Sequence, residues 1–226
     1  MIVWLASYPR SGNTLLRTVL RHAFGQRSYS IHNDKFGDDT DAVVADLVGH
    51  LPIDVPIDDF LKQSSAGNRL TLIKTHDAPL AAYDSEPVIY VVRDGRSVVV
   101  SYLNYLRRVM RRPNVTLDHV IRGQNVKFGD WSSHIVNWHP TVRSRALIVR
   151  YEVLAYDTAK AIRAISDFLE LSPIADWRND FSRMHQIYPQ FFNAGDDRKN
   201  IAALRGNSEK LFWELHGDSM TQMGYG

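Results

Sequence analysis

A loop with the sequence SYPRSGNT, residues 7–14, joins a short apolar run to a segment with helical character. Pro9 rigidifies the turn, and Gly12 allows close approach of the backbone to a ligand or a positive φ. Arg10 adds a positive charge in a planar fork. The loop's other polar side chains are Ser11, Asn13 and Thr14. Because a helix start also presents unpaired N–H groups, the loop predicts a phosphate cradle; a Pro-Gly turn closed by a Thr N-cap is the alternative.

The loop differs from the phosphate cradle of ATP-binding P-loop proteins. That motif ends in Gly-Lys-Ser/Thr, with the lysine on the β- and γ-phosphates and the hydroxyl on Mg²⁺. Here Asn13 stands in the lysine position, and Arg10 lies three positions before it. The sequence therefore disfavours a magnesium-nucleotide site and keeps phosphate binding. A P-loop kinase or another nucleotide-binding protein acting on ATP is the alternative function.

A lysine and a histidine follow a second apolar run. Residues 70–74 end in Lys74, and His76 comes two positions later. Imidazole titrates near neutral pH, so a histidine at a strand end is suited to take a proton from an attacking group. His76 is therefore a candidate general base. A structural histidine is the alternative, because the chain holds nine histidines.

An arginine follows a third apolar run. Residues 88–92 lead directly into Arg93, and Ser101 lies eight positions later in a segment with helical spacing. An arginine at such a strand end can hold a second phosphate. The alternative is an ion pair with Asp94 or another carboxylate. The sequence thus predicts a second anion site at Arg93.

The elements that position these residues follow from hydrophobic patterning. Near-continuous apolar runs predict strands covered on both faces of a parallel sheet. These runs are residues 2–6, 70–74, 88–92 and 146–150. Apolar residues recur at helical spacing between them, as in 98–109 and 162–169. The pattern predicts an α/β fold, P-loop-like and three-layered, with a mostly parallel central sheet flanked by helices. In such sheets ligands bind beyond the carboxyl ends of the strands.

Three other segments give predictions about local structure. The polar stretch 25–41 predicts a surface loop. Trp131 and Trp138, seven residues apart, predict the buried face of a helix, with a wall of the substrate pocket as the alternative. A group of arginines at a predicted helix end favours a solvated face, with attraction of an acidic ligand as the alternative. These are Arg107, Arg108, Arg111 and Arg112.

Composition bounds the possible functions. With 226 residues, 44% of them hydrophobic, we expect a single domain over residues 1–226. A net charge of +2 is too weak to indicate nucleic acid as a partner. The chain has no cysteine, which excludes disulfides and a thiolate nucleophile, and its histidines lack the spacing of a metal site. No long apolar run exists, and a strand predicted from residue 2 leaves no room for a leader, so we expect a cytoplasmic protein without a membrane span.

Together these stretches resemble the sulfotransferases that use 3′-phosphoadenosine-5′-phosphosulfate (PAPS), including the cytosolic type and many bacterial relatives. The family's 5′-phosphosulfate loop reads Y-P-K/R-S-G-T/N-T, and residues 8–14 match it throughout. Its K-T-H-x-x-P stretch matches residues 74–79. Its 3′-phosphate stretch, Y-x-x-R followed by a serine eight residues on, matches Tyr90, Arg93 and Ser101.

The resemblance extends over nearly the whole chain, in the family's order. Tyr151 and Glu152 match a later Y-E pair, and the ending GDSMTQMGYG (217–226) resembles the family's closing helix and Gly-Tyr. Two positions depart from the family pattern. Leu15 stands where a tryptophan stacks on adenine, so adenine contact is expected to depend more on Tyr151 or another group, or to be looser. Asn193 stands where a late arginine reaches the 3′-phosphate, and the expected replacement is Arg198 or Lys199.

The resemblance implies transfer of a sulfuryl group from PAPS to a hydroxyl or amine of a small-molecule acceptor. The other product would be 3′-phosphoadenosine-5′-phosphate (PAP). His76 would act as general base, with Lys74 and Arg10 stabilising the developing negative charge. The 5′-phosphate would be held by Ser11, Gly12, Asn13 and Thr14, and the 3′-phosphate by Arg93 and Ser101. In-line transfer of this kind depends on positioning and charge stabilisation, and no metal is expected.

Overall fold

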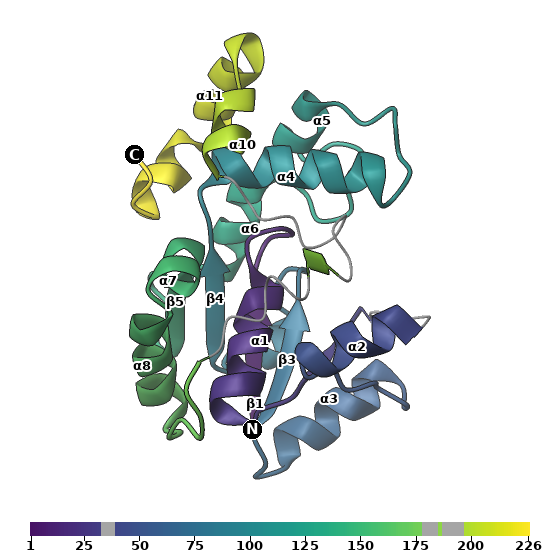
Figure 1. The fold of residues 1–226 in the computed structure, drawn as a ribbon, viewed down its shortest axis with the longest axis vertical. Helices are drawn as coiled ribbons and strands as arrows, with labels where there is room; N and C mark the ends of the chain where they lie inside the picture. The colour runs from purple at the N-terminus through teal and green to yellow at the C-terminus, as the bar shows by residue number, and fades with distance from the viewer. Residues whose placement is uncertain (33–38, 178–184, 187–196) are drawn as a thin grey trace.

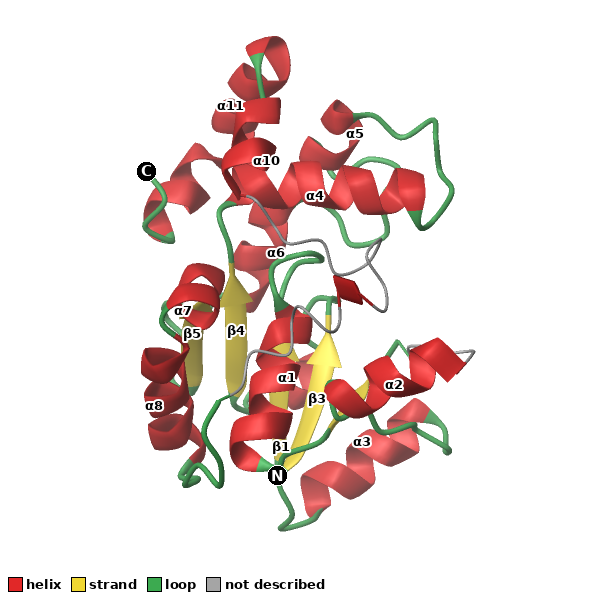
Figure 2. Cartoon of the chain, in the orientation of Figure 1, coloured by secondary structure: helices red, strands yellow, loops and turns green. Residues whose placement is uncertain are grey.

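A five-stranded sheet lies at the centre of the molecule, with helices on both of its faces (Figures 1 and 2). The structure is a computed structural model that describes residues 1–32, 39–177, 185–186 and 197–226. The strands are β1 (Ile2–Ala6), β2 (Ser28–Ser30), β3 (Thr71–Thr75), β4 (Val88–Val92) and β5 (Ala146–Arg150). Their order is β2-β3-β1-β4-β5, and every pair is parallel. The predicted α/β fold with a parallel central sheet is confirmed.

The helices connect the strands and extend beyond the sheet. Those that follow the first three strands are α1 (Asn13–Phe24), α2 (Asp39–Leu47), α3 (Ile57–Ala66) and the short 3-10 helix η1 (Ala81–Tyr83). After β4 come α4 (Gly95–Arg108), α5 (Leu117–Ile121) and α6 (Trp131–Trp138). After β5 come α7 (Tyr151–Tyr156), α8 (Thr158–Leu169), α10 (Asp197–Ala203) and α11 (Gly206–Gln222). Helix α4 lies across the end of the sheet toward which the arrows of β3 and β4 point (Figure 1).

The apolar strands are explained by burial on both faces of the sheet. Along β1, Trp4 packs into a cluster with α3, α4, α6 and α11, whereas Leu5 packs into a second cluster with α1 and α8. Trp131 and Trp138 of α6 are both 1% exposed and belong to the first cluster, so the prediction that they are core residues is confirmed. A continuous apolar run is the pattern expected of strands covered in this way.

Two predictions about element bounds need correction. The strand predicted at 70–74 covers Thr71–Thr75, so Lys74 lies inside it. The stretch 25–41 is not only a loop, because it contains β2 and the start of α2. Strand β2 has the polar sequence SYS, and its Ser28 is buried where the Arg17 Nε donates a hydrogen bond of 2.8 Å to the serine Oγ. A polar strand of three residues carries no apolar pattern to reveal it.

Candidate active site

The predicted site residues lie just beyond the carboxyl ends of neighbouring strands. Ala6, the last residue of β1, pairs with Thr75 of β3 and with Tyr90 of β4. The loop that begins at Ser7 therefore lies beside His76 on one side and the end of β4 on the other. Parallel strands bring these separate stretches of sequence to one edge of the sheet.

The loop after β1 has a left-handed backbone at two positions. Gly12, the N-cap of α1, has a φ of 109°, and Arg10 has a φ of 68°. A Cβ added to Gly12 would lie only 2.6 Å from Cδ2 of Tyr151. Gly12 is thus required both by its backbone conformation and by the close packing of the Tyr151 ring. Its carbonyl accepts the first hydrogen bond of α1 from Leu16, which leaves the earlier N–H groups of the helix without intrahelical partners.

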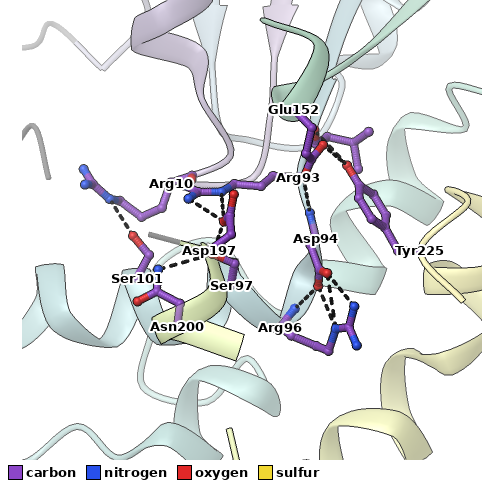
Figure 3. Close-up of polar contacts among 11 residues, drawn as sticks. Arg10, Arg93, Asp94, Arg96, Ser97, Ser101, Glu152, Asp197, Asn200 and Tyr225 are labelled. Carbon is purple, nitrogen blue, oxygen red and sulfur yellow. Dashed lines mark hydrogen bonds and ion pairs between the residues drawn. The ribbon is translucent and has the colours of Figure 1, made fainter. Parts of the chain in front are cut away.

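Arg10 connects the loop to α4. Its Nε donates to the Oγ of Ser101 at 3.4 Å, and its guanidinium lies 5.3 Å from the centre of the Tyr105 ring. Its carbonyl accepts a hydrogen bond of 3.2 Å from Nη1 of Arg93. Burial lowers the pKa of Arg10 to about 10, and the charge of Arg93 contributes, so Arg10 stays charged at neutral pH. The structure therefore brings together Arg10, Arg93 and Ser101 (Figure 3).

The polar residues of the loop differ in what they can offer a ligand. The Asn13 amide donates to the carbonyl of Leu5 at 2.8 Å and to the Oγ of Ser7 at 3.2 Å, so its side chain fixes the loop on β1. The side-chain amide of Asn13 is thus already used within the protein, whereas the sequence had suggested it as a donor to the ligand. Ser11 is buried, and its N–H donates to the carbonyl of Tyr8 at 3.2 Å. Thr14 is half-buried in the first turn of α1.

His76 is held in one tautomer at the end of β3. Its Nδ1 lies 2.6 Å from the carbonyl oxygen of Ser7, so Nδ1–H donates and Nε2 is the basic nitrogen. Burial lowers the pKa of His76 well below its usual value, and the nearby charge of Lys74 lowers it further. The imidazole is consequently neutral at pH 7, the state that a general base requires.

His32 is a neighbour of His76 that the sequence did not single out. Its Nε2 accepts a hydrogen bond of 3.2 Å from the backbone N–H of His76, and the two rings stack with centres 5.8 Å apart. The same His32 nitrogen lies 3.7 Å from a carboxylate oxygen of Asp77, and Phe128 packs edge-on against both imidazoles. His32 follows β2 in the chain, so recognising that strand would have drawn attention to it.

Arg93 pairs with a carboxylate that lies more than 100 residues further along the chain. Its Nε and Nη2 lie 2.9 and 2.6 Å from Oδ1 of Asp197, the first residue of α10 (Figure 3). Ser97 donates to the same oxygen at 2.5 Å, and the Asn200 amide donates to Ser97 at 3.2 Å. The guanidinium carbon of Arg93 is 4.0 Å from the centre of the Tyr151 ring. The sequence had suggested Asp94 or another carboxylate as the partner, and it is Asp197.

Asp94, the carboxylate that the sequence suggested as a partner of Arg93, contacts Arg96 and Glu152 instead. Its carboxylate accepts from the backbone N–H of Arg96 at 2.9 Å and forms an ion pair of 2.6 Å with the Arg96 guanidinium, so it caps the start of α4. The Asp94 N–H donates to Glu152 at 3.4 Å, and Glu152 also accepts from the Tyr225 hydroxyl at 2.7 Å. Glu152 thereby joins the end of the chain to the start of α4 (Figure 3).

Two predicted positions are placed away from these contacts. Arg198, the residue after Asp197, is exposed in the first turn of α10. Leu15, in the position of the family's tryptophan, is half-buried and packs against the core cluster of α1 and α8. Asn193 lies outside the described residues.

The described residues show neither a metal-binding cluster nor a membrane-spanning helix. None of their histidine, aspartate and glutamate side chains form a group of three or more that could hold a metal ion. Across the same stretches of chain, no helix combines the length and the apolar character needed to cross a membrane.

The chain belongs to the sulfotransferase family, because the sulfotransferase domain matches residues 2–191. It is 27% identical over 187 residues to Sulfotransferase 1E1 of Mus musculus, a match covering 76% of this chain and 60% of that protein. It is 27% identical over 208 residues to Sulfotransferase 4A1 of Mus musculus, covering 85% of this chain and 68% of that protein. The chain thus spans about 60% to 68% of the length of these relatives.

Solved structures share the fold. The mouse sulfotransferase SULT7A1 complexed with PAP superposes with a TM-score of 0.65 at 20% identity, covering 97% of this chain and 84% of that one. Retinol dehydratase in complex with androsterone and PAP gives a TM-score of 0.64 at 16% identity, covering 97% and 80%.

Proposed function

We propose that this protein transfers a sulfuryl group from PAPS to a hydroxyl or amine of a small-molecule acceptor, as a single domain over residues 1–226. Family membership supports the reaction class. The observation that carries the proposal is the convergence, at one sheet edge, of a neutral His76 with a basic Nε2 and two arginines joined by the Arg93–Arg10 hydrogen bond. The two PAP-bound structures with the same fold support the choice of donor.

The donor is bound at two places in this proposal. The loop residues Arg10 to Thr14 take the 5′-phosphosulfate, chiefly through the N–H groups at the start of α1 and the charge of Arg10. Arg93 and Ser101 take the 3′-phosphate. Tyr151 packs against Gly12 and beneath Arg93, between the two anion sites, which supports a role beside the nucleoside. Arg198 contributes charge from the start of α10.

In the transfer step, Nε2 of His76 takes the proton of the acceptor hydroxyl or amine as its oxygen or nitrogen attacks sulfur. The sulfur–oxygen bond to the 5′-phosphate breaks in line, and PAP leaves. Lys74 and Arg10 stabilise the charge that grows on the transferred group and on the leaving oxygen. No step calls on a metal ion. Androsterone and retinol, which retinol dehydratase holds in its structures, are small molecules of the acceptor class proposed here.

A kinase-like protein acting on ATP is the competing function. It shares the strand-loop-helix start, but the loop lacks the Lys-Ser/Thr pair that holds Mg²⁺-ATP. We propose further that the protein acts in the cytoplasm, as a relative of the cytosolic-type enzymes, with no nucleic acid partner.

Isothermal titration calorimetry distinguishes the two functions. We expect PAP to bind in the presence of EDTA and to bind more tightly than ADP with Mg²⁺, because only PAP carries a phosphate for Arg93. Tighter binding of Mg²⁺-ADP, or PAP binding that requires the metal, would refute the sulfotransferase assignment and favour the ATP-dependent one.

A further inference from the structure

The contact between Asp197 and Arg93 has the geometry of an occupied anion site. One carboxylate oxygen accepts hydrogen bonds from Nε of Arg93 and from Oγ of Ser97, and Nη2 of Arg93 lies at ion-pair distance from it, 2.6 Å. A planar guanidinium that faces an anion with two of its nitrogens, beside a hydroxyl donor, is an arrangement that proteins use for phosphate oxygens. In Figure 3 the Arg93 and Ser97 side chains point at the Asp197 carboxylate, which comes from a different element.

The donors are held in place by contacts other than Asp197. The Tyr151 ring lies 4.0 Å from the Arg93 guanidinium carbon, and Nη1 of Arg93 donates to the Arg10 carbonyl. The Asn200 amide donates to Ser97. The Arg93 side chain is only 6% exposed, so its charge requires a counter-charge, and Asp197 supplies it in the structure. The cradle is therefore built to hold one anion.

A phosphate and the Asp197 carboxylate would compete for this cradle. Both are negative, and both would need the same N–H groups of Arg93. Two like charges at hydrogen-bond distance from one buried guanidinium repel each other strongly. Binding of one anion therefore requires the other to leave.

We infer that Asp197 is a specificity-determining residue, whose carboxylate occupies the 3′-phosphate subsite formed by Arg93 and Ser97 and competes with that phosphate. This inference rests on the proposed function, in which Arg93 receives the 3′-phosphate, and it adds Ser97 to that subsite. Asp197 lowers the affinity for nucleotides with a 3′-phosphate and leaves unchanged the affinity for nucleotides without one. It also keeps the Arg93 charge paired when no nucleotide is bound.

The test compares PAP with AMP, which differ only in the 3′-phosphate. Calorimetry is run on the full chain and on Asp197→Asn in a chloride buffer free of phosphate and sulfate. We expect the variant to bind PAP at least about tenfold more tightly than the wild type and to bind AMP with unchanged affinity. Asp84→Asn, which removes the same charge from the Arg143 ion pair away from the site, is the control and leaves both affinities unchanged.

Two further variants keep the inference testable if Asp197→Asn folds poorly. Asp197→Glu retains the competing charge, so its PAP affinity should stay within about threefold of the wild type. In an Arg93→Ala background, Asp197→Asn should no longer change PAP affinity, because the shared partner is gone.

The outcomes separate this inference from the proposed function. If the wild type binds PAP and Asp197→Asn leaves that binding unchanged or weakens it, Asp197 is a structural partner of Arg93 and the inference is overturned. An equal gain for PAP and AMP would overturn it too, because the effect would then not depend on the 3′-phosphate. If the wild type binds neither nucleotide, the proposed function itself fails.

Discussion

The packing of Gly12 against Tyr151 makes Gly12→Ala a sharp test of how the loop is built. The new Cβ would lie 2.6 Å from a ring carbon, and the residue would have to keep a φ of 109°. The backbone cost for a residue with a Cβ is about 1–2 kcal/mol, and overpacking adds about 1–3 kcal/mol. We therefore expect the free energy of unfolding to fall by about 2–5 kcal/mol.

A matched variant separates the two contributions. Gly129 also has a positive φ, 67°, but a Cβ added there would meet nothing within 4 Å. Gly129→Ala should therefore show only the backbone cost, about 1 kcal/mol. Adding Tyr151→Ala to Gly12→Ala should return part of the lost stability, because the clashing ring is removed. Urea unfolding followed by circular dichroism measures all four proteins.

Gly12→Ala should also weaken PAP binding. A displaced Tyr151 ring loses its contact with Arg93, which is worth about 1–2 kcal/mol, so PAP affinity should fall about tenfold. Equal destabilisation of Gly12→Ala and Gly129→Ala, with unchanged PAP affinity in both, would refute the reasoning. The Tyr151 ring would then move aside without lowering the free energy of unfolding, and it would have no part in positioning Arg93.

The remaining predictions concern the histidines. His76→Ala should lower kcat by about 10²–10⁴ and leave PAP affinity within about threefold; a turnover equal to the wild type would remove His76 as the base. Burial lowers the pKa of His76, so the base should stay unprotonated near pH 7 and kcat/KM for PAPS should stay level there. The value of kcat/KM should fall only when the pH drops below 6.5. A pH profile whose acidic limb has its midpoint above 6.5 would contradict the argument that burial lowers this pKa. His32→Asn keeps an acceptor for the His76 N–H, whereas His32→Phe does not, so kcat should be higher in the asparagine variant.

Much of the fold could be predicted from the sequence because β1 and β4 are buried on both faces and β5, at the sheet edge, is also apolar apart from Arg150. Runs 2–6, 88–92 and 146–150 match β1, β4 and β5 residue for residue, since continuous apolarity leaves few alternatives. Strand β2 could not be predicted, because its serines are buried by hydrogen bonding and by pairing with β3. Its position at the sheet edge depends on tertiary contacts that a short polar stretch does not reveal.

The arrangement of the candidate site could likewise be predicted only in part from the sequence. The sequence located Arg10, His76 and Arg93 from their places after strands, and parallel pairing brings such places together. It did not reveal that Asp197 would meet Arg93, because that contact depends on how α10 packs on α4 more than 100 residues later. Nor did it indicate the direction of the Asn13 side chain, which depends on its hydrogen bonds to the carbonyl of Leu5 and to Ser7.

Transfer of ³⁵S from labelled PAPS tests the central claim most directly. The protein is treated with EDTA and incubated with labelled PAPS and a panel of phenols, alcohols, sugars and amines. We predict labelled product with at least one class of acceptor, no requirement for added Mg²⁺, and a large loss of product in His76→Ala. No transfer to any acceptor, together with Mg²⁺-dependent turnover of ATP by the same preparation, would contradict the account.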